Sequence, residues 1–389
     1  MSKSTFTAKY LARTALGVPR DLVNTFIASK VKAIRPTVLI YNCTFVCDAR
    51  CEMCNNWKRG DRKADMTLDQ VDRAMNHPFW GAVEHLNISG GEPTTRNDLP
   101  ELTELLIRRL PRTRKVGINT TGLTPHRAIP QLTRIVEFCA SRDLPVSIRV
   151  SLDGIGEIHD QVRQVKRGFD KAGETITAME ALARTHANFQ FGIAATIFTT
   201  NMGDARNILD WSRARNLDIV FNMLRFTDAM LGNRELESTI RLKTQEEEFM
   251  RQFFLERVEE ESVLSGQAFQ YLHYADMIAN GYVRTMPCPF RTQGLLLNPD
   301  GTLFYCENSK PLGNIMQESA EELYFKAGHL ADRATFEETI CKNCLSPCQV
   351  NVGAMKQFVP YAKFLKRAYD VKRAPERHLE TVPAGEHAR

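Results

Sequence analysis

Three cysteines lie within one eight-residue stretch, at Cys47, Cys51 and Cys54, in the spacing C-x3-C-x2-C. A structural zinc site takes four protein ligands and a disulfide joins two cysteines, so three thiols suit neither arrangement alone. Three thiolates can instead bind three irons of a [4Fe–4S] cluster and leave the fourth iron open. The segment GGEP at residues 90–93 adds flexible backbone and a carboxylate that could hold a bound amine near that iron. On the cysteine spacing alone, a zinc knuckle stays an open alternative.

Six short segments rich in β-branched residues predict strands. Their ranges are 37–42, 84–89, 115–119, 146–151, 190–197 and 219–224. Amphipathic helical patterns lie between them, and the strand starts are 29 to 47 residues apart, which fits successive βα units. Right-handed crossovers between parallel strands give either a barrel or an open doubly wound sheet.

The polar and glycine-rich signals fall at the same end of these predicted strands. The cysteines follow the first strand, and GGEP, NTTG at 119–122 and SLDG at 151–154 end the next three. Arg225 follows the sixth strand. Chemistry in such folds gathers at the carboxyl ends of the strands. We therefore predict one active site at the mouth of a partial (β/α)6 barrel.

A second group of five cysteines follows a helical, charged region. Between the first two of these cysteines, a hairpin is predicted to turn at residues 300–301. The five cysteines are Cys288, Cys306, Cys341, Cys344 and Cys348. A zinc ribbon built from four of them stays an open alternative, because thiolate spacing does not distinguish iron from zinc.

Composition limits the class of protein. The chain has 389 residues, ten cysteines and a formal net charge of +5, and it shows neither a signal sequence nor a membrane-spanning apolar run. Clustered cysteines without an export signal favour metal binding over disulfides, so we expect a cytoplasmic protein. The charge is too small to indicate nucleic-acid binding.

Together the two motifs resemble the radical SAM superfamily: the three cysteines match its cluster motif and GGEP its methionine-binding motif. The resemblance implies that S-adenosylmethionine (SAM) binds the open iron and that its cleavage gives a 5′-deoxyadenosyl radical. Met53 stands where the family usually has an aromatic residue near adenine, and Ser151 and Asp153 fall where it contacts ribose and carboxylate. The expected SAM-binding residues are Met53, Gly90, Gly91, Glu92, Pro93, Asn119, Ser151 and Asp153.

The later part of the chain is similar to radical SAM enzymes with SPASM or Twitch extensions. The resemblance implies one auxiliary [4Fe–4S] cluster held by Cys288, Cys306, Cys341 and Cys344, with Cys348 either replacing a ligand or free. Cys43 and Cys139 are expected to be buried apolar residues, although Cys43 leads the cluster loop and could donate a hydrogen atom.

These features predict five regions: a basic helical extension (1–36), a radical SAM core (37–235), a helical linker (236–287), a small cysteine-rich auxiliary-cluster domain (288–350) and a basic helical tail (351–389). The expected function is hydrogen abstraction leading to oxidative modification of a peptide or small metabolite, with flavodoxin or ferredoxin as reductant. An epimerase, a lipid-modifying enzyme at a membrane surface and a non-catalytic electron carrier remain alternatives. The basic termini either contact a membrane weakly or pack on the protein.

Overall fold

The computed structural model describes residues 33–263, 265–284, 288, 290–346 and 358–373, together with Val23 and Ile27. The predicted N-terminal helices, the end of the basic tail and Cys348 lie outside these residues. The chain divides into two units. The first contains Met1–Ile240 and Phe290–Phe336, and the second contains Arg241–Pro289 and Glu337–Arg389.

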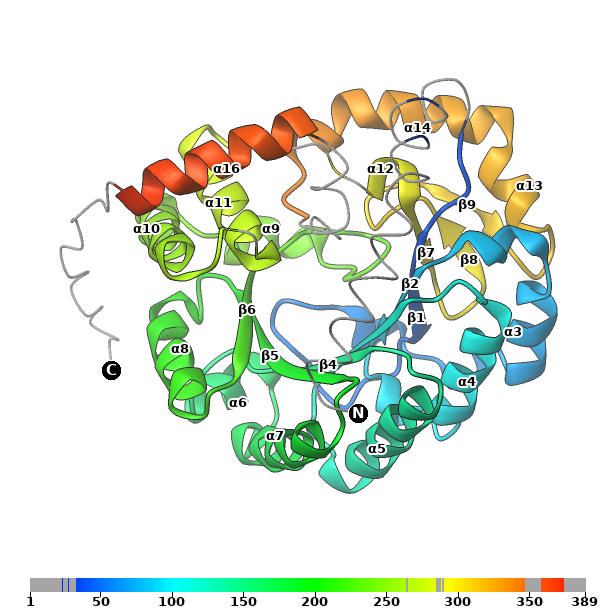
Figure 1. The fold of residues 1–389 in the computed structure, drawn as a ribbon, viewed down its shortest axis with the longest axis horizontal. Coiled ribbons are helices and arrows are strands. Elements are labelled where there is room, and N and C mark those ends of the chain that lie inside the picture. The colour runs from blue at the N-terminus through cyan, green and yellow to red at the C-terminus, as the bar shows by residue number, and fades with distance from the viewer. Residues whose placement is uncertain are drawn as a thin grey trace. The chain divides into compact units, whose positions relative to one another are not determined.

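The first unit is built on one nine-stranded sheet in the order β6-β5-β4-β3-β2-β1-β7-β8-β9. Every pairing from β6 through β1 to β7 is parallel, whereas β8 and β9 are antiparallel additions at the edge (Figure 1). The strands are β1 (Val38–Thr44), β2 (His85–Gly90), β3 (Lys115–Thr120), β4 (Val146–Ser151), β5 (Phe189–Ile197), β6 (Asp218–Met223), β7 (Gly294–Leu297), β8 (Thr302–Phe304) and β9 (Pro311–Asn314). The parallel βα architecture predicted for the partial barrel is confirmed.

Helices connect successive parallel strands and cover one face of the sheet (Figure 1). They are α3 (Leu68–Met75), α4 (Leu99–Arg109), α5 (Pro125–Ser141), α6 (Glu157–Arg163), α7 (Gly168–Thr185) and α8 (Ala205–Ala214). Leu86 and Ile88 of β2 pack with Leu102 and Leu106 of α4 in the main apolar core. The intervening strand residues face the other side of the sheet, because side chains alternate along a strand. The apolar alternation thus directs one face of each strand to the helices.

The segment from 290 to 336 belongs to the barrel's unit, whereas we predicted that it forms part of a separate cysteine-rich domain. The reason is the run GLLL in β7, which pairs in parallel with β1 and is buried throughout. The predicted hairpin is confirmed: β7 and β8 are antiparallel, and Gly301 takes the positive φ of +87° that its turn requires. Helices α12 (Phe290–Gln293) and α13 (Ala320–Phe325) flank these strands, and α14 (Ala327–Thr339) follows.

The second unit is helical. Its described helices are α10 (Thr244–Glu260), α11 (Gly266–Ala279) and α16 (Phe358–Arg373), and α9 (Glu237–Ile240) precedes them in the first unit. Phe364, Ala368 and Val371 of α16 are buried, and the Phe364 ring lies 4.5 Å from that of Phe269. The apolar face of α16 is thus used for packing within the unit, which favours packing over membrane contact for this helix. Within the described residues, no helix is long and apolar enough to cross a membrane.

Short 3-10 helices complete the structure. They are η2 (Asn56–Arg59), η3 (Arg62–Ala64), η4 (Pro78–Ala82), η5 (Pro93–Thr95), η6 (Met202–Asp204), η7 (Arg234–Leu236) and η8 (Cys341–Asn343). Helix η2 begins directly after the cysteine loop. Helix η5 begins at the proline of GGEP, directly after its two glycines and its glutamate.

Candidate active site at the carboxyl ends of the strands

The three cysteines lie in the loop between β1 and η2. All three are free thiols; Cys51 is buried, while Cys47 and Cys54 are partly exposed. Two backbone hydrogen bonds hold the middle of the loop against α6: Arg50 N–H donates to the carbonyl of Arg163 at 3.2 Å, and Glu52 N–H to that of Val162 at 3.0 Å. The loop is therefore anchored to an element more than one hundred residues away in sequence.

The GGEP segment lies against the start of the same loop. Gly91 N–H donates to the Thr44 carbonyl at 2.7 Å, and Glu92 N–H donates to the Val46 carbonyl at 2.9 Å. A Cβ atom at Gly90 would lie 2.1 Å from the Thr44 carbonyl oxygen, and one at Gly91 would lie 2.5 Å from that of Val46. Gly90 also has a φ of +140°. Both glycines are required by the close approach of two backbones.

The Glu92 carboxylate is fully buried and accepts hydrogen bonds from three threonines. Its Oε1 accepts from Thr94 N–H (3.0 Å), Thr94 Oγ1 (2.6 Å) and Thr120 Oγ1 (2.8 Å), and its Oε2 accepts from Thr121 N–H (2.6 Å). Burial, followed by the nearby Asp48 carboxylate, raises the pKa of Glu92. A cation bound near Oε2 would offset this cost, because an opposite charge favours the ionised carboxylate.

We expect Glu92→Ala to weaken SAM binding by about 1.5–3 kcal/mol, the usual contribution of a hydrogen bond to a charged group. Equilibrium binding of SAM to the reconstituted protein measures the change. Glu84→Ala is the matched control, because Glu84 is also buried but stands before β2, at the opposite end of that strand. Equal SAM affinity in the Glu92 variant and the unaltered protein would remove Glu92 from the SAM site.

Asp153 lies just beyond β4 and is completely buried. Its Oδ1 accepts from Thr196 N–H at 2.7 Å, and its Oδ2 forms an ion pair with Arg163. Ser151, the last residue of β4, is partly exposed, and Asn119 of β3 is exposed. Ser151 and Asn119 are thus accessible to a ligand, whereas the Asp153 carboxylate is engaged within the protein.

His159 of α6 supports the same corner of the site. It is buried, and its Nδ1 accepts from Asp153 N–H at 3.1 Å. Burial, with a smaller contribution from the Arg163 charge, lowers the pKa of His159 to about 3. The folded protein therefore holds this imidazole neutral.

This shift predicts acid sensitivity. Below pH 6.5 the unfolded state binds a proton that folded His159 does not, so the free energy of unfolding should fall by about 1.4 kcal/mol per pH unit until about pH 3. Between pH 7 and pH 5, His159→Asn should remove about 2 kcal/mol of this dependence, as measured by denaturant unfolding at both values. Burial also lowers the pKa of His273 to about 3, so the dependence should decrease but persist. An unchanged pH dependence in the variant would contradict the prediction.

Asn233 is a site residue that the sequence did not identify. Its buried side-chain amide donates to the carbonyls of Met53 (2.8 Å) and Arg225 (2.9 Å) and accepts from Thr227 N–H (2.9 Å). The loop after β6 also contacts the cysteine loop directly, since Asn55 N–H donates to the Leu231 carbonyl at 2.9 Å. No motif marks Asn233; only its three side-chain hydrogen bonds in the folded chain show that it fixes the backbone of Met53.

The segment after β6 also contacts the residue that follows Cys306. Arg225 forms an ion pair with Glu307 at 2.9 Å, and Glu307 is the residue after Cys306.

Cys43 is fully buried in the main apolar core, and burial raises the pKa of its thiol to about 12. Its environment is that of a structural cysteine, as is that of buried Cys139.

The remaining described cysteines lie in the second unit. Burial, followed by the nearby Cys288 and Cys344 thiols, raises the pKa of Cys341 to about 12. Arg284 holds the backbone here: its Nη1 donates to the carbonyls of Cys344 (2.8 Å) and Ser346 (2.9 Å). The unit thus brings Cys288, Cys341 and Cys344 into one neighbourhood, whereas Cys306 belongs to the first unit.

Within the described part of the chain, no three His, Cys, Asp or Glu side chains converge on a point suited to one metal ion. A [4Fe–4S] cluster does not require such convergence, because each thiolate binds a different iron. Three free thiols on a loop held between α6 and the GGEP segment supply a donor set that fits this cluster.

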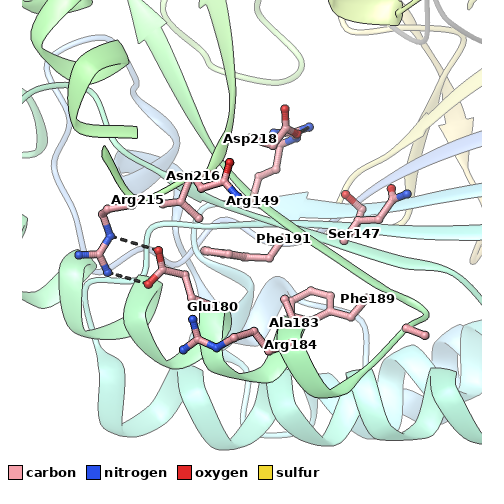
Figure 2. Close-up of a pocket in the computed structure, with 13 residues that line it drawn as sticks. Ser147, Arg149, Glu180, Ala183, Arg184, Phe189, Phe191, Arg215, Asn216 and Asp218 are labelled. Atoms are coloured by element: carbon pink, nitrogen blue, oxygen red, sulfur yellow. Dashed lines mark hydrogen bonds and ion pairs between the residues drawn. The ribbon is translucent and has the colours of Figure 1, made fainter. Parts of the chain in front are cut away.

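A cavity of about 610 Å³ lies at the opposite ends of the strands (Figure 2). It is lined near the starts of β4, β5 and β6 by Ser147, Phe189 and Asp218, and on its helical side by the Glu180–Arg215 ion pair of 2.7 Å. None of the predicted site residues lines this cavity, so it is distinct from the candidate active site.

The sequence profile of the Radical SAM superfamily matches residues 41–211. This segment is a radical SAM domain. It contains the three cysteines of the loop, GGEP and the SLDG segment, so the resemblance of these motifs is confirmed.

Several curated proteins align with parts of the chain, including the following two. The molybdenum cofactor biosynthesis protein moc-5 of Caenorhabditis elegans is 29% identical over 215 residues, which is 52% of this chain and 34% of moc-5. The mycofactocin maturase MftC of Mycolicibacterium smegmatis is 30% identical over 153 residues, 38% of this chain and 34% of MftC. The alignments therefore span about a third of each relative.

The fold likeness extends beyond the radical SAM domain. The crystal structure of Streptococcus suis SuiB bound to S-adenosylmethionine aligns with a TM-score of 0.55 at 15% identity, covering 86% of this chain and 77% of SuiB. A second SuiB structure, with the same TM-score, holds the precursor peptide SuiA. The two proteins share a fold that includes strands and helices C-terminal to the radical SAM domain.

Proposed function

We propose that this protein is a radical SAM enzyme that abstracts a hydrogen atom from a carbon of a peptide or small metabolite. The substrate is thereby converted to an oxidised product. The observation that carries the proposal is the joining of the cysteine loop to GGEP by two backbone hydrogen bonds at the carboxyl ends of the strands. Together with SAM, a reduced [4Fe–4S] cluster supplies a 5′-deoxyadenosyl radical as the abstracting group.

The chain's own residues have separate roles. Cys47, Cys51 and Cys54 would hold three irons, and the GGEP backbone with Glu92 would bind the methionine part of SAM. Ser151 and Asn119 are the accessible polar groups for the rest of SAM. Asn233 fixes the backbone of Met53, the residue expected near adenine. Cys51 and Met53 are buried, which limits the access of water to this part of the loop and would protect a reactive intermediate there.

An auxiliary [4Fe–4S] cluster is proposed to accept an electron from the substrate radical. Its ligands would be Cys288, Cys306, Cys341 and Cys344; Cys348 is an alternative ligand and lies outside the described residues. A cysteine thiol that donated a hydrogen atom would instead give an epimer. The burial of Cys43 in the apolar core disfavours it as that donor. Flavodoxin or ferredoxin would reduce the SAM cluster.

Peptide modification is the favoured substrate class. MftC is named a maturase, and SuiB has been crystallised with its precursor peptide. The name of moc-5 points instead to cofactor biosynthesis, so a small metabolite is the second candidate. A lipid substrate has less support, because the apolar face of α16 packs within its own unit.

The test is anaerobic incubation of reduced, reconstituted protein with SAM, followed by measurement of 5′-deoxyadenosine and methionine. Slow cleavage is expected even without substrate, whereas an electron carrier would neither bind nor cleave SAM. Candidate substrates are then processed in deuterated water. Two-electron oxidation without deuterium at the attacked carbon supports the proposed outcome, and deuterium without oxidation would establish the epimerase.

A further inference from the structure

Arg163, the last residue of α6, connects the cysteine loop to the end of β4. Its side chain is buried, and its Nη1 donates to Cys51 Sγ at 3.6 Å. Its Nη2 forms an ion pair with the carboxylate of Asp153. Its own carbonyl accepts from Arg50 N–H, so both the backbone and the side chain of Arg163 contact the loop.

Asp153 fixes the guanidinium in this position. The carboxylate is fully buried and is itself held by Thr196 N–H at 2.7 Å, while the Asp153 carbonyl accepts from Asn201 at 2.8 Å. A buried arginine held by a rigid carboxylate cannot turn toward solvent. The N–H that points at Cys51 is therefore part of the fixed structure.

A guanidinium beside a cluster thiolate has a definite electrostatic effect. Hydrogen bonds to cluster sulfurs and the charge around them set the reduction potential of an iron–sulfur cluster. Reduction adds one negative charge, so a nearby cation favours the reduced state and a nearby anion disfavours it. Arg163 and Asp153 therefore act in opposite directions, and Arg163 is the one that touches the sulfur.

We propose that Arg163, held by Asp153, is a positioning residue that sets the reduction potential of the SAM cluster through Cys51. Asp153 thus acts through Arg163, and its carboxylate does not contact SAM. This inference rests on the proposed function, because it requires a cluster on Cys47, Cys51 and Cys54.

The rival explanation is that the pair only stabilises the fold. Buried ion pairs often serve to hold elements together, and removing one partner is strongly destabilising because it leaves an uncompensated buried charge. A purely structural pair would lower stability when broken but would leave the cluster potential unchanged.

The test is an EPR-monitored redox titration of the SAM cluster in the whole 389-residue chain, with Cys306→Ala in every sample to remove the auxiliary signal. Arg163→Met should lower the reduction equilibrium constant at least tenfold, which is 59 mV for one electron. Asp153→Asn should shift the potential in the positive direction. Arg215→Met, which removes a paired guanidinium at the other end of the strands, should leave it unchanged.

Arg163→Lys serves as the test if Arg163→Met fails to hold iron, because lysine keeps the positive charge. Its potential should exceed that of any loaded Met variant. Where no Met variant is loaded, its reduction equilibrium constant should lie within about threefold of the parent's. Equal potentials in the parent, Asp153→Asn and the Arg163 variants would overturn the inference while SAM cleavage continued. Absence of iron from the parent's Cys47 site would instead overturn the proposed function, so the two failures are distinguishable.

Discussion

Replacing Cys47, Cys51 and Cys54 together by alanine should abolish SAM cleavage and reduce the iron content to about four per chain. Two Fe4S4 units give about eight irons and eight sulfides in the unaltered protein. The triple variant removes every protein ligand of the SAM cluster but leaves the second cysteine group intact. Iron and sulfide analysis after anaerobic reconstitution, with assay of 5′-deoxyadenosine, measures both effects.

The matched control is the double variant Cys43→Ala, Cys139→Ala, since both thiols are buried in the apolar core. It should keep about eight irons and the cleavage activity, with some loss of stability. Zinc without iron in the triple variant would identify the second cysteine group as a zinc ribbon. Full SAM cleavage by the triple variant would refute the assignment of the cluster ligands.

Gly90→Ala should be among the most damaging single methyl additions in the chain. The new Cβ would lie 2.1 Å from the Thr44 carbonyl oxygen, which is backbone and cannot swing away, and the φ of +140° is unsuited to alanine. Overpacking and backbone strain together should cost about 2–6 kcal/mol. Because Thr44 is the last residue of β1, directly before the cysteine loop, iron loading should fall as well. Denaturant unfolding and iron analysis give the two readouts.

Gly81→Ala is the control, because no atom lies within 4 Å of a Cβ at Gly81. This variant should match the parent in iron content and stay within about 1 kcal/mol of it in stability. Equal stability of the Gly90 and Gly81 variants would show that the contact between GGEP and the cysteine loop is not constrained as described.

Much of the barrel could be predicted because its signals are local. The six predicted strands agree with β1 to β6 to within two residues at each end, since apolar alternation reports which side chains face the helices. The turn before β8 could be predicted because Gly301 supplies a positive φ. The alignment of polar segments at the strand ends predicted one candidate site, because parallel strands all end at one edge.

The membership of β7 could not be predicted. Its four residues, GLLL, carry no alternation, because the strand is buried on both faces. The hairpin that it begins was therefore assigned to a separate domain, whereas pairing with β1 joins it to the barrel's unit. Short apolar runs do not indicate their partner, and only the packing of the whole sheet selects one.

By itself the sequence predicted which residues would hold iron and SAM, because each motif is contiguous. Three thiols lie within eight residues, and two glycines and a carboxylate lie within GGEP. Tertiary structure decided what surrounds them. Arg163 reaches Cys51 across 112 residues, and Asn233 reaches Met53 across 180. Neither contact has a sequence spacing that could predict it, because it depends on two strand ends meeting at one edge of the sheet. The candidate ligands could therefore be predicted from local sequence, whereas the charges and hydrogen bonds around them arise only when the sheet assembles.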